Sequence, residues 1–277
     1  MCSSDLSDAR STGRRLAFAN WLFADDSLAA SLVARVHVNR IWQHHFGTGL
    51  VATPENLGLS GAPPSHPELL DALAHQFIAG GWGQKPIHRR ILLSGTYCQS
   101  SAASEAAVAG DADGRLLSRY PLRRLDAEAI RDSMLAASGD LDRRFFGPYV
   151  PTSRDGAGEV MVAESNPGSR RRSIYLNQRR TQVVSFLAVF DAPSIVFNSL
   201  SRPRSTMPLQ SLALLNSEFA ANRAKSLAER LVALHPQQAA LMVNEAYLRL
   251  VARPASAAEI ELAKALDRKS TRLNSSH

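Results

Sequence analysis

The stretch from residue 28 to residue 46 predicts a long helix with apolar side chains on every side. Leu28, Val33 and Trp42 fall at different angles around its axis, and Gly47 permits the left-handed turn that ends many helices. A helix that is apolar all round is expected to be buried. Polar side chains are interspersed along the same stretch, and buried polar groups need hydrogen-bond partners. We therefore expect this helix to anchor a polar network.

Seven residues are candidates for that network or for a ligand site: His37, Asn39, Arg40, Trp42, His44, His45 and, on the following loop, His66. His37, Arg40 and His44 lie within about 60° of one another, since each helical residue adds roughly 100°. A structural network, which we favour, and an anion or substrate site both fit this stripe. Metal binding fits poorly, because His37 and His44 are about 10 Å apart along the axis, too far for one ion. We predict no metal site.

Most of the remaining chain also predicts helices, separated by loops rich in glycine and proline. Capping boxes occur at residues 65–68 and 256–259, and residues 171–176 predict a short strand. The expected fold class is mainly α: an irregular multi-helix domain with long loops and at most a short β element. Helices are expected over residues 14–23, 27–46, 65–80, 86–93, 125–137, 208–231, 237–251 and from 257, with loops over 47–65, 100–119 and 147–170. Loops as long as the last are often functional or disordered.

The two ends of the chain do not fit this pattern. Residues 1–6 and 267–277 resemble translated sequencing adapter, and the second stretch carries no helical period. We exclude both from the expected domain, which spans residues 7–266 as a fragment and would divide, if it has two subdomains, near 100–120 or 147–170. The natural termini are then expected to be missing, so that a signal peptide is not observable. Cys98 is left as the one native cysteine, which excludes an internal disulfide.

The charge balance is basic, with 32 Lys and Arg against 25 Asp and Glu and a net charge of +7. An arginine-rich, lysine-poor chain fits a GC-rich genome, and acidic residues interleave with several arginine clusters. Nucleic-acid binding is not favoured, because no recognition motif accompanies the charge and only residues 170–180 combine arginines with an aromatic ring. The candidate anion-binding residues are Arg171, Arg172, Arg202 and Arg204, although the last two could instead pair with Asp191.

The chain has no motif that predicts a reaction. It lacks a nucleophile elbow, a phosphate-binding loop and a dinucleotide fingerprint. Glycoside hydrolysis needs two facing carboxylates, and nothing in the sequence pairs those present. No apolar run approaches the roughly 20 residues that span a bilayer, so no membrane span is expected.

A series of motifs carries a family resemblance, and the most specific runs from Asn39 to Gly47 (NRIWQHHFG). Further motifs are Pro64–Asp71, Ser94–Ser101, Arg123–Asp132, Phe190–Pro193 and Pro208–Asn216. Together they resemble a planctomycete-specific domain of unknown function, and the resemblance covers nearly all of residues 14–262. That domain is usually C-terminal in large proteins that also carry a planctomycete-type cytochrome c domain.

The resemblance implies an exported protein, in the periplasm or cell envelope, with haem c on a missing upstream domain and no cofactor in this fragment. It brings no catalytic residues. We expect an accessory or binding module whose partners are other domains of the same protein and, as a further candidate, a glycan or anionic ligand. One alternative is a catalytic domain that acts on complex glycans through residues 37–45 and nearby loops. A second is a basic nucleic-acid-binding module.

Overall fold

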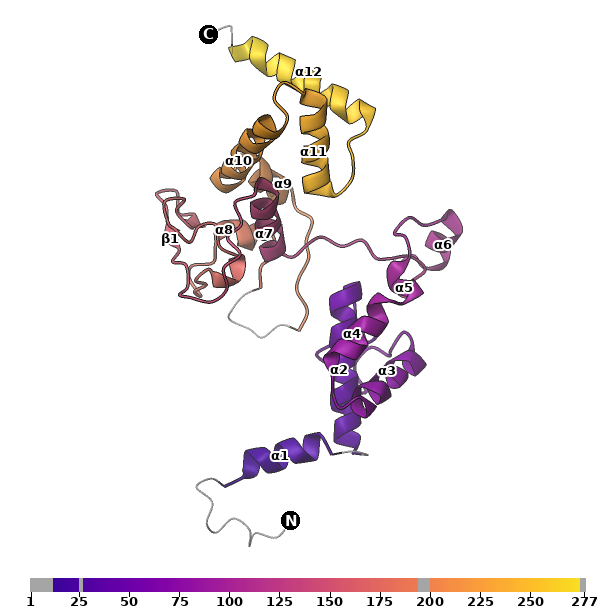
Figure 1. Ribbon diagram of the computed structural model, residues 1–277. Coiled ribbons are helices and arrows are strands. Elements are labelled where there is room, and N and C mark those ends of the chain that lie inside the picture. Colours follow the sequence, from indigo (N-terminus) through magenta and orange to yellow (C-terminus); the bar gives the residue numbers. More distant parts are fainter. Residues whose placement is uncertain (1–11, 25–26, 194–199, 275–277) are drawn as a thin grey trace. The chain divides into compact units, whose positions relative to one another are not determined.

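The computed structural model describes residues 12–24, 27–193 and 200–274, with side chains up to residue 266 (Figure 1). The chain divides into two compact units, Met1–Arg123 and Arg124–His277, and each unit has its own hydrophobic core. In the described ranges the structure is mostly helix, with one two-stranded sheet. The predicted mainly α fold class is confirmed.

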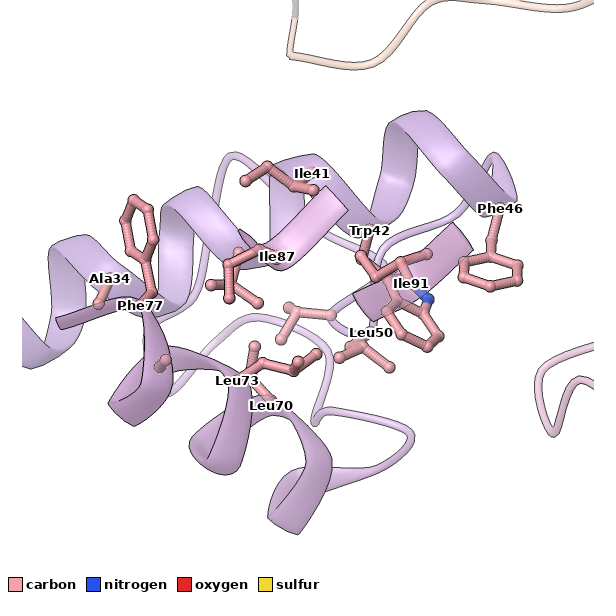
Figure 2. Close-up of a cluster of buried hydrophobic side chains, with 13 residues drawn as sticks. Ala34, Ile41, Trp42, Phe46, Leu50, Leu70, Leu73, Phe77, Ile87 and Ile91 are labelled. Carbon is pink, nitrogen blue, oxygen red and sulfur yellow. The ribbon is translucent and has the colours of Figure 1, made fainter. Parts of the chain in front are cut away.

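The first unit is a group of helices around α2. Its core comes from α2, α3, α4 and the loop after α2, and Figure 2 shows their apolar side chains meeting between the helices. Trp42 and Phe46 stack with ring centres 4.3 Å apart, and Leu70 and Phe77 of α3 pack in the same core. The helices are α1 (Arg14–Leu22), α2 (Leu28–Phe46), α3 (Pro67–Ala79), α4 (Gln84–Leu92), α5 (Gly95–Cys98) and α6 (Glu105–Gly110).

Helix α2 has the predicted bounds but is not buried on every side. Ser27 caps its start by accepting a hydrogen bond from Ala30 N, and Gly47 ends it at a φ of 89°. Leu28 is 91% exposed, and Leu32 is exposed as well. The expectation of an all-round buried helix is therefore wrong, because the other elements of the unit cover only one side of α2.

The loop after α2 is fixed to the helix by a buried asparagine. Asn39, which is 1% exposed, accepts a hydrogen bond from Val51 N at 2.8 Å and donates to Val51 O at 3.1 Å. A Cβ on Gly49 would lie within 2.7 Å of the Asn39 amide and the Val51 carbonyl oxygen, so this loop needs glycine there. Asn39 thus fixes the following loop to α2.

Two local expectations for the first unit are corrected. The capping box predicted at residues 65–68 does not form: His66 is the N-cap residue of α3 and makes no side-chain cap. The segment 100–119 is more ordered than expected, since it contains α6 and a turn organised by Asp111. The Asp111 carboxylate accepts hydrogen bonds from Leu116 N and Ser118 N, and the first of these is the main reason its pKa is lowered.

The second unit packs helices around α7 and a small hairpin. Ala127, Val184 and Leu187 are among its buried core residues. Strands β1 (Ser153–Arg154) and β2 (Val160–Met161) pair antiparallel within the expected long loop. The helices are α7 (Ala127–Ser138), the 3-10 turn η2 (Ser173–Tyr175), α8 (Ser185–Val189), α9 (Pro208–Asn216), α10 (Glu218–Leu234), α11 (Ala239–Val251) and α12 (Ala257–Asn274).

Three local expectations for the second unit are corrected. Residues 171–176 contain η2 in place of a strand, and only isolated bridges pair them with residues 142 and 150. The helix expected over 208–231 is two helices, because Ser217 leaves helical geometry and its hydroxyl caps α10 through Ala220 N. Helix α12 begins after the predicted cap at Ser256 and continues to Asn274, through a segment without helical period.

Residues 1–6, expected to be foreign to the domain, lie outside the described residues. Over the ranges that the structure describes, none of the helices combines the length and the apolar character that crossing a membrane requires.

Candidate functional site

The carboxyl end of α2 holds a histidine pair. His45 Nε2 lies 2.8 Å from Nδ1 of His88 on α4, so one imidazole donates a hydrogen bond to the other. Tyr120 OH donates to the carbonyl of His45 at 3.1 Å, and Arg123 Nη2 donates to the carbonyl of His44 at 2.8 Å. These bonds satisfy carbonyls that the last turn of a helix leaves without backbone partners. The cluster therefore stabilises the end of α2.

The surroundings of His45 disfavour its charged form. Burial lowers the pKa of His45 below its usual 6.5, and the nearby charges of His88, Arg123 and His44 lower it further. Burial also raises the pKa of Tyr120, which keeps its hydroxyl protonated as a donor. At neutral pH the imidazole of His45 is neutral and can keep its hydrogen bond to His88.

The predicted stripe of polar residues lies on the exposed side of α2. His37, Arg40 and His44 are all exposed. The ring of His37 stacks on Phe77 with centroids 5.5 Å apart, and its Nε2 lies 3.3 Å from the amide nitrogen of Gln84. These side chains cover the core or face solvent, so they do not form the buried network that the sequence suggested.

The other candidates of the first unit make separate contacts. Asn39 holds the following loop, and Trp42 is buried against Phe46. His66 is half-buried, with Nδ1 3.0 Å from Ser65 Oγ. The contacts described for Asn39, Trp42 and His45 are packing contacts and hydrogen bonds within the first unit.

The buried guanidinium of Arg171 is bound by its own chain. It lies 3.8 Å above the centre of the Tyr175 ring. Its Nη1 donates to the carbonyl of Pro148 at 2.9 Å, and its Nη2 donates to that of Phe146. Arg171 therefore fixes the segment 146–148 in place.

The neighbouring candidate arginines contact carboxylates. Arg172 lies 3.6 Å from Asp132, and Arg202 lies 2.6 Å from Glu128. Arg204 is exposed. An anion that bound to Arg172 or Arg202 would have to compete with these carboxylates.

The partner of Asp191 differs from the one considered from sequence. Arg124 Nη2 donates to Asp191 at 2.6 Å, and Ser205 donates through both N–H and hydroxyl. The hydrogen bond from Ser205 N is the main cause of a lowered pKa for Asp191, followed by that from Arg124. The pairing of Asp191 with Arg202 or Arg204, which the sequence offered as an alternative, is replaced by a pairing with Arg124, 67 residues away.

The second unit contains a cavity of about 850 Å³ between β2, α8 and the turn that joins α9 to α10. Its lining is largely apolar and includes Met161, Phe186, Leu212 and Phe219. Small-molecule sites in proteins typically enclose about 300–1,000 Å³ and are lined mostly by apolar and aromatic side chains. The size and lining of this cavity therefore suit a small organic ligand.

A buried arginine forms part of the cavity wall. Arg131 of α7 donates from Nη1 to the carbonyl of Arg171 at 3.0 Å and from Nη2 to that of Ser169 at 2.6 Å. Its guanidinium carbon lies 5.1 Å from the centre of the Phe219 ring. Burial lowers the pKa of Arg131 to about 10, and Asp132 partly opposes this shift. Arg131 is therefore still charged at neutral pH.

A second buried arginine joins three segments around the cavity. The side chain of Arg223 on α10 is 4% exposed and donates to Asp140 at 2.5 Å and to Glu164 at 2.8 Å. Glu164 also lines the cavity. This ion-pair network holds the cavity wall against α10.

The polar groups of the cavity lining include carboxylates and the buried Arg131. Four carboxylates line it, from Asp155, Glu159, Glu164 and Glu218, and its described lining contains no histidine or cysteine that could serve as base or nucleophile. Asp155 accepts backbone hydrogen bonds from Ala157 and Glu159. Within the described residues no group of three or more His, Cys, Asp or Glu side chains could hold a metal ion.

Sequence reasoning missed this cavity. The one signal was the length of the 147–170 segment, since long loops are often functional. The sequence predicted one continuous helix over the segment that contains Leu212 and Phe219, and it did not indicate that both residues line a cavity.

Residues 14–266 match the family model PSD1, described as "Protein of unknown function (DUF1553)". No curated protein and no solved structure matches the chain.

Proposed function

The chain belongs to the PSD1 family of proteins of unknown function, and we propose that it is an accessory, ligand-binding module of a larger exported protein. The observation that carries this proposal is the apolar cavity of about 850 Å³ in the second unit. Its wall is fixed by the buried side chains of Arg131 and Arg223, so the site is largely formed before a ligand arrives. A preformed site loses little free energy to ordering on binding.

Binding is favoured over glycan catalysis for two reasons. The polar residues of α2 that would serve a reaction are engaged in packing, as for Asn39 and His45, or spread along the exposed side, as for His37. In the cavity, Glu164 is paired with Arg223, Asp155 accepts hydrogen bonds from backbone N–H groups, and the other two lining carboxylates, Glu159 and Glu218, are exposed to solvent. A retaining or inverting glycosidase needs two carboxylates free to act as acid and as nucleophile or base.

The proposal extends to the rest of the protein. The motif resemblance supports an export signal and a cytochrome domain that carries haem c elsewhere in the same chain, with the module itself free of haem. The gene sequence upstream of this segment tests it. We expect a signal peptide and a Cys-x-x-Cys-His motif, and a cytoplasmic start without a haem motif would contradict this part of the proposal.

A fragment screen by ligand-observed NMR tests the cavity itself. Ala213 lines the cavity, and Ala213→Trp places an indole in it; Leu212→Trp does so from a more exposed lining position. Fragments that bind the full chain should lose binding in both variants and keep it in Ala228→Trp, which alters an exposed residue of α10. Thermal unfolding checks that each variant is folded. A screen without hits, or hits indifferent to both cavity variants, would remove the basis of the proposal.

A further inference from the structure

Three aromatic side chains are exposed within five consecutive residues of the second unit. Phe145, Phe146 and Tyr149 are 72%, 85% and 64% exposed. Single exposed apolar residues are common, but contiguous ones mark interaction surfaces. We call residues 145–149 the aromatic loop.

The aromatic loop is held in a strained conformation. Phe146 has a φ of 64°, which is unfavourable for a bulky side chain. Its N–H donates to the Tyr175 hydroxyl at 2.9 Å, and Arg171 donates to the carbonyls of Phe146 and Pro148. Strained backbone persists where the surrounding structure fixes it, and it concentrates at functional sites. The two phenylalanines are thus presented by a rigid support.

Two backbone hydrogen bonds, one before and one after the aromatic loop, attach this part of the chain to the rest of the second unit. On one side Asp142 N donates to Arg170 O at 2.9 Å, and on the other Val150 N donates to Tyr175 O at 2.7 Å. Residues 143–149 form the excursion between them. A hollow of about 530 Å³ adjoins it, and Arg144 and Asn166 are part of its lining.

Four exposed arginines lie within two residues of the first attachment, at the base of this excursion: Arg143, Arg144, Arg170 and Arg172. Three of them pair with aspartates. Arg144 lies 2.7 Å from Asp142, Arg170 lies 3.8 Å from Asp140, and Arg172 lies 3.6 Å from Asp132. Ion pairs of exposed arginines contribute little to stability, so a surface dense in lipid phosphates can compete with the three carboxylates for these cations.

We propose that the aromatic loop docks on an anionic lipid bilayer. The rings of Phe145 and Phe146 enter the interfacial region, Tyr149 lies at the headgroup level, and the arginines at the base bind lipid phosphates. Apolar side chains beside Arg or Lys are the combination that holds proteins at membrane surfaces, through buried area and attraction to anionic lipid. This site is separate from the cavity and does not depend on a ligand there.

Vesicle co-sedimentation of the full chain tests this. The chain should sediment with vesicles of phosphatidylglycerol and phosphatidylcholine in equal parts, much less with phosphatidylcholine alone, and less as salt rises. Phe145→Ser and Phe146→Ser should each lower the partition coefficient by about tenfold, the effect of withdrawing one ring from an apolar phase. Leu59→Ser, which changes an exposed leucine of the first unit, should leave it unchanged.

A further variant tests whether vesicle binding requires the aromatic loop to be held in its conformation. Arg171→Lys keeps the charge but loses the two-pronged contact with the loop, and it should weaken vesicle binding even at unchanged net charge. If that variant is unstable in thermal unfolding, Gly147→Ala serves instead, because the φ of 92° at Gly147 disfavours any side chain. The proposal is overturned if the full chain does not bind anionic vesicles, if it binds neutral ones equally well, or if the phenylalanine variants bind as the parent does.

Discussion

Nε2 of His45 lies 2.8 Å from Nδ1 of His88 and joins the last turn of α2 to α4. The pair requires at least one neutral ring, because two protonated imidazoles have no acceptor to share. Its surroundings enforce neutrality, since burial and the charges of His88, Arg123 and His44 lower the pKa of His45.

The first prediction is a loss of stability in mild acid. Because the pKa of His45 is lower in the folded than in the unfolded chain, its neutral form contributes stability that is complete above about pH 6.5. That contribution is lost as pH falls toward the folded-state pKa. Urea unfolding between about pH 5 and pH 8 should show this slope, and His45→Gln should flatten it. An unchanged slope in His45→Gln would show that other groups cause it; His75→Gln, which changes an exposed histidine of α3, is the control.

The second prediction concerns the loop held by Asn39. Asn39→Ala leaves the N–H and C=O of Val51 without their side-chain partner and should lower the free energy of unfolding by about 2–4 kcal/mol. Gly49→Ala should also destabilise, because its Cβ would meet the Val51 carbonyl oxygen at 2.6 Å. Gly95→Ala is the matched control, since nothing lies within 4 Å of a Cβ there. Chemical unfolding measures all three, and equal stability of Gly49→Ala and Gly95→Ala would contradict the packing described.

The third prediction concerns the ion pairs of Arg223. Arg223→Met leaves Asp140 and Glu164 without their buried cation and should cost about 3–5 kcal/mol of unfolding free energy. Arg230→Met on the same helix removes an exposed hydrogen bond to Gly139 O and should cost less than about 1 kcal/mol. Guanidinium unfolding followed by far-UV circular dichroism compares them. Similar losses in the two variants would mean that the network contributes no more than a surface contact.

The fourth prediction is a direct titration. Hydrogen bonds from the Arg144 side chain, followed by that from its backbone N–H, lower the pKa of Asp142 to about 2. Carboxyl-carbon NMR should show this pKa rising toward 3.8 in Arg144→Gln, and in the parent it should rise as salt is added. Any stability linked to Asp142 is present above about pH 3.8 and is lost as pH falls toward 2. A pKa that does not respond to Arg144→Gln would assign the shift to another cause.

Local structure was largely predictable from the sequence. The bounds of α2, the glycine that ends α7 and the cap of α12 follow from residues within four positions of one another. Two of the incorrect helix predictions also have local causes. Ser217 interrupts a helix because its hydroxyl caps the next one, and Ser65 fails to cap α3 because His66 occupies that position.

The candidate sites were much less predictable. Side chains on every side of α2 were expected to be buried, yet Asn39 is buried and His37 is exposed. Arg171 was a candidate for anion binding, and its guanidinium donates to the carbonyls of Phe146 and Pro148. The cavity draws its lining from segments that the sequence separates, from Arg131 to Phe219.

The sequence by itself determined the mainly α fold class, most helix ends and, through its motifs, the family. These depend on hydrogen bonds and side-chain periods that span a few residues. Only the tertiary structure decided which polar side chains are buried and what they bind, as in the pairing of Arg223 with Asp140, 83 residues away. The free energy of a charge depends on which groups surround it in space, and its neighbours along the chain do not fix those groups.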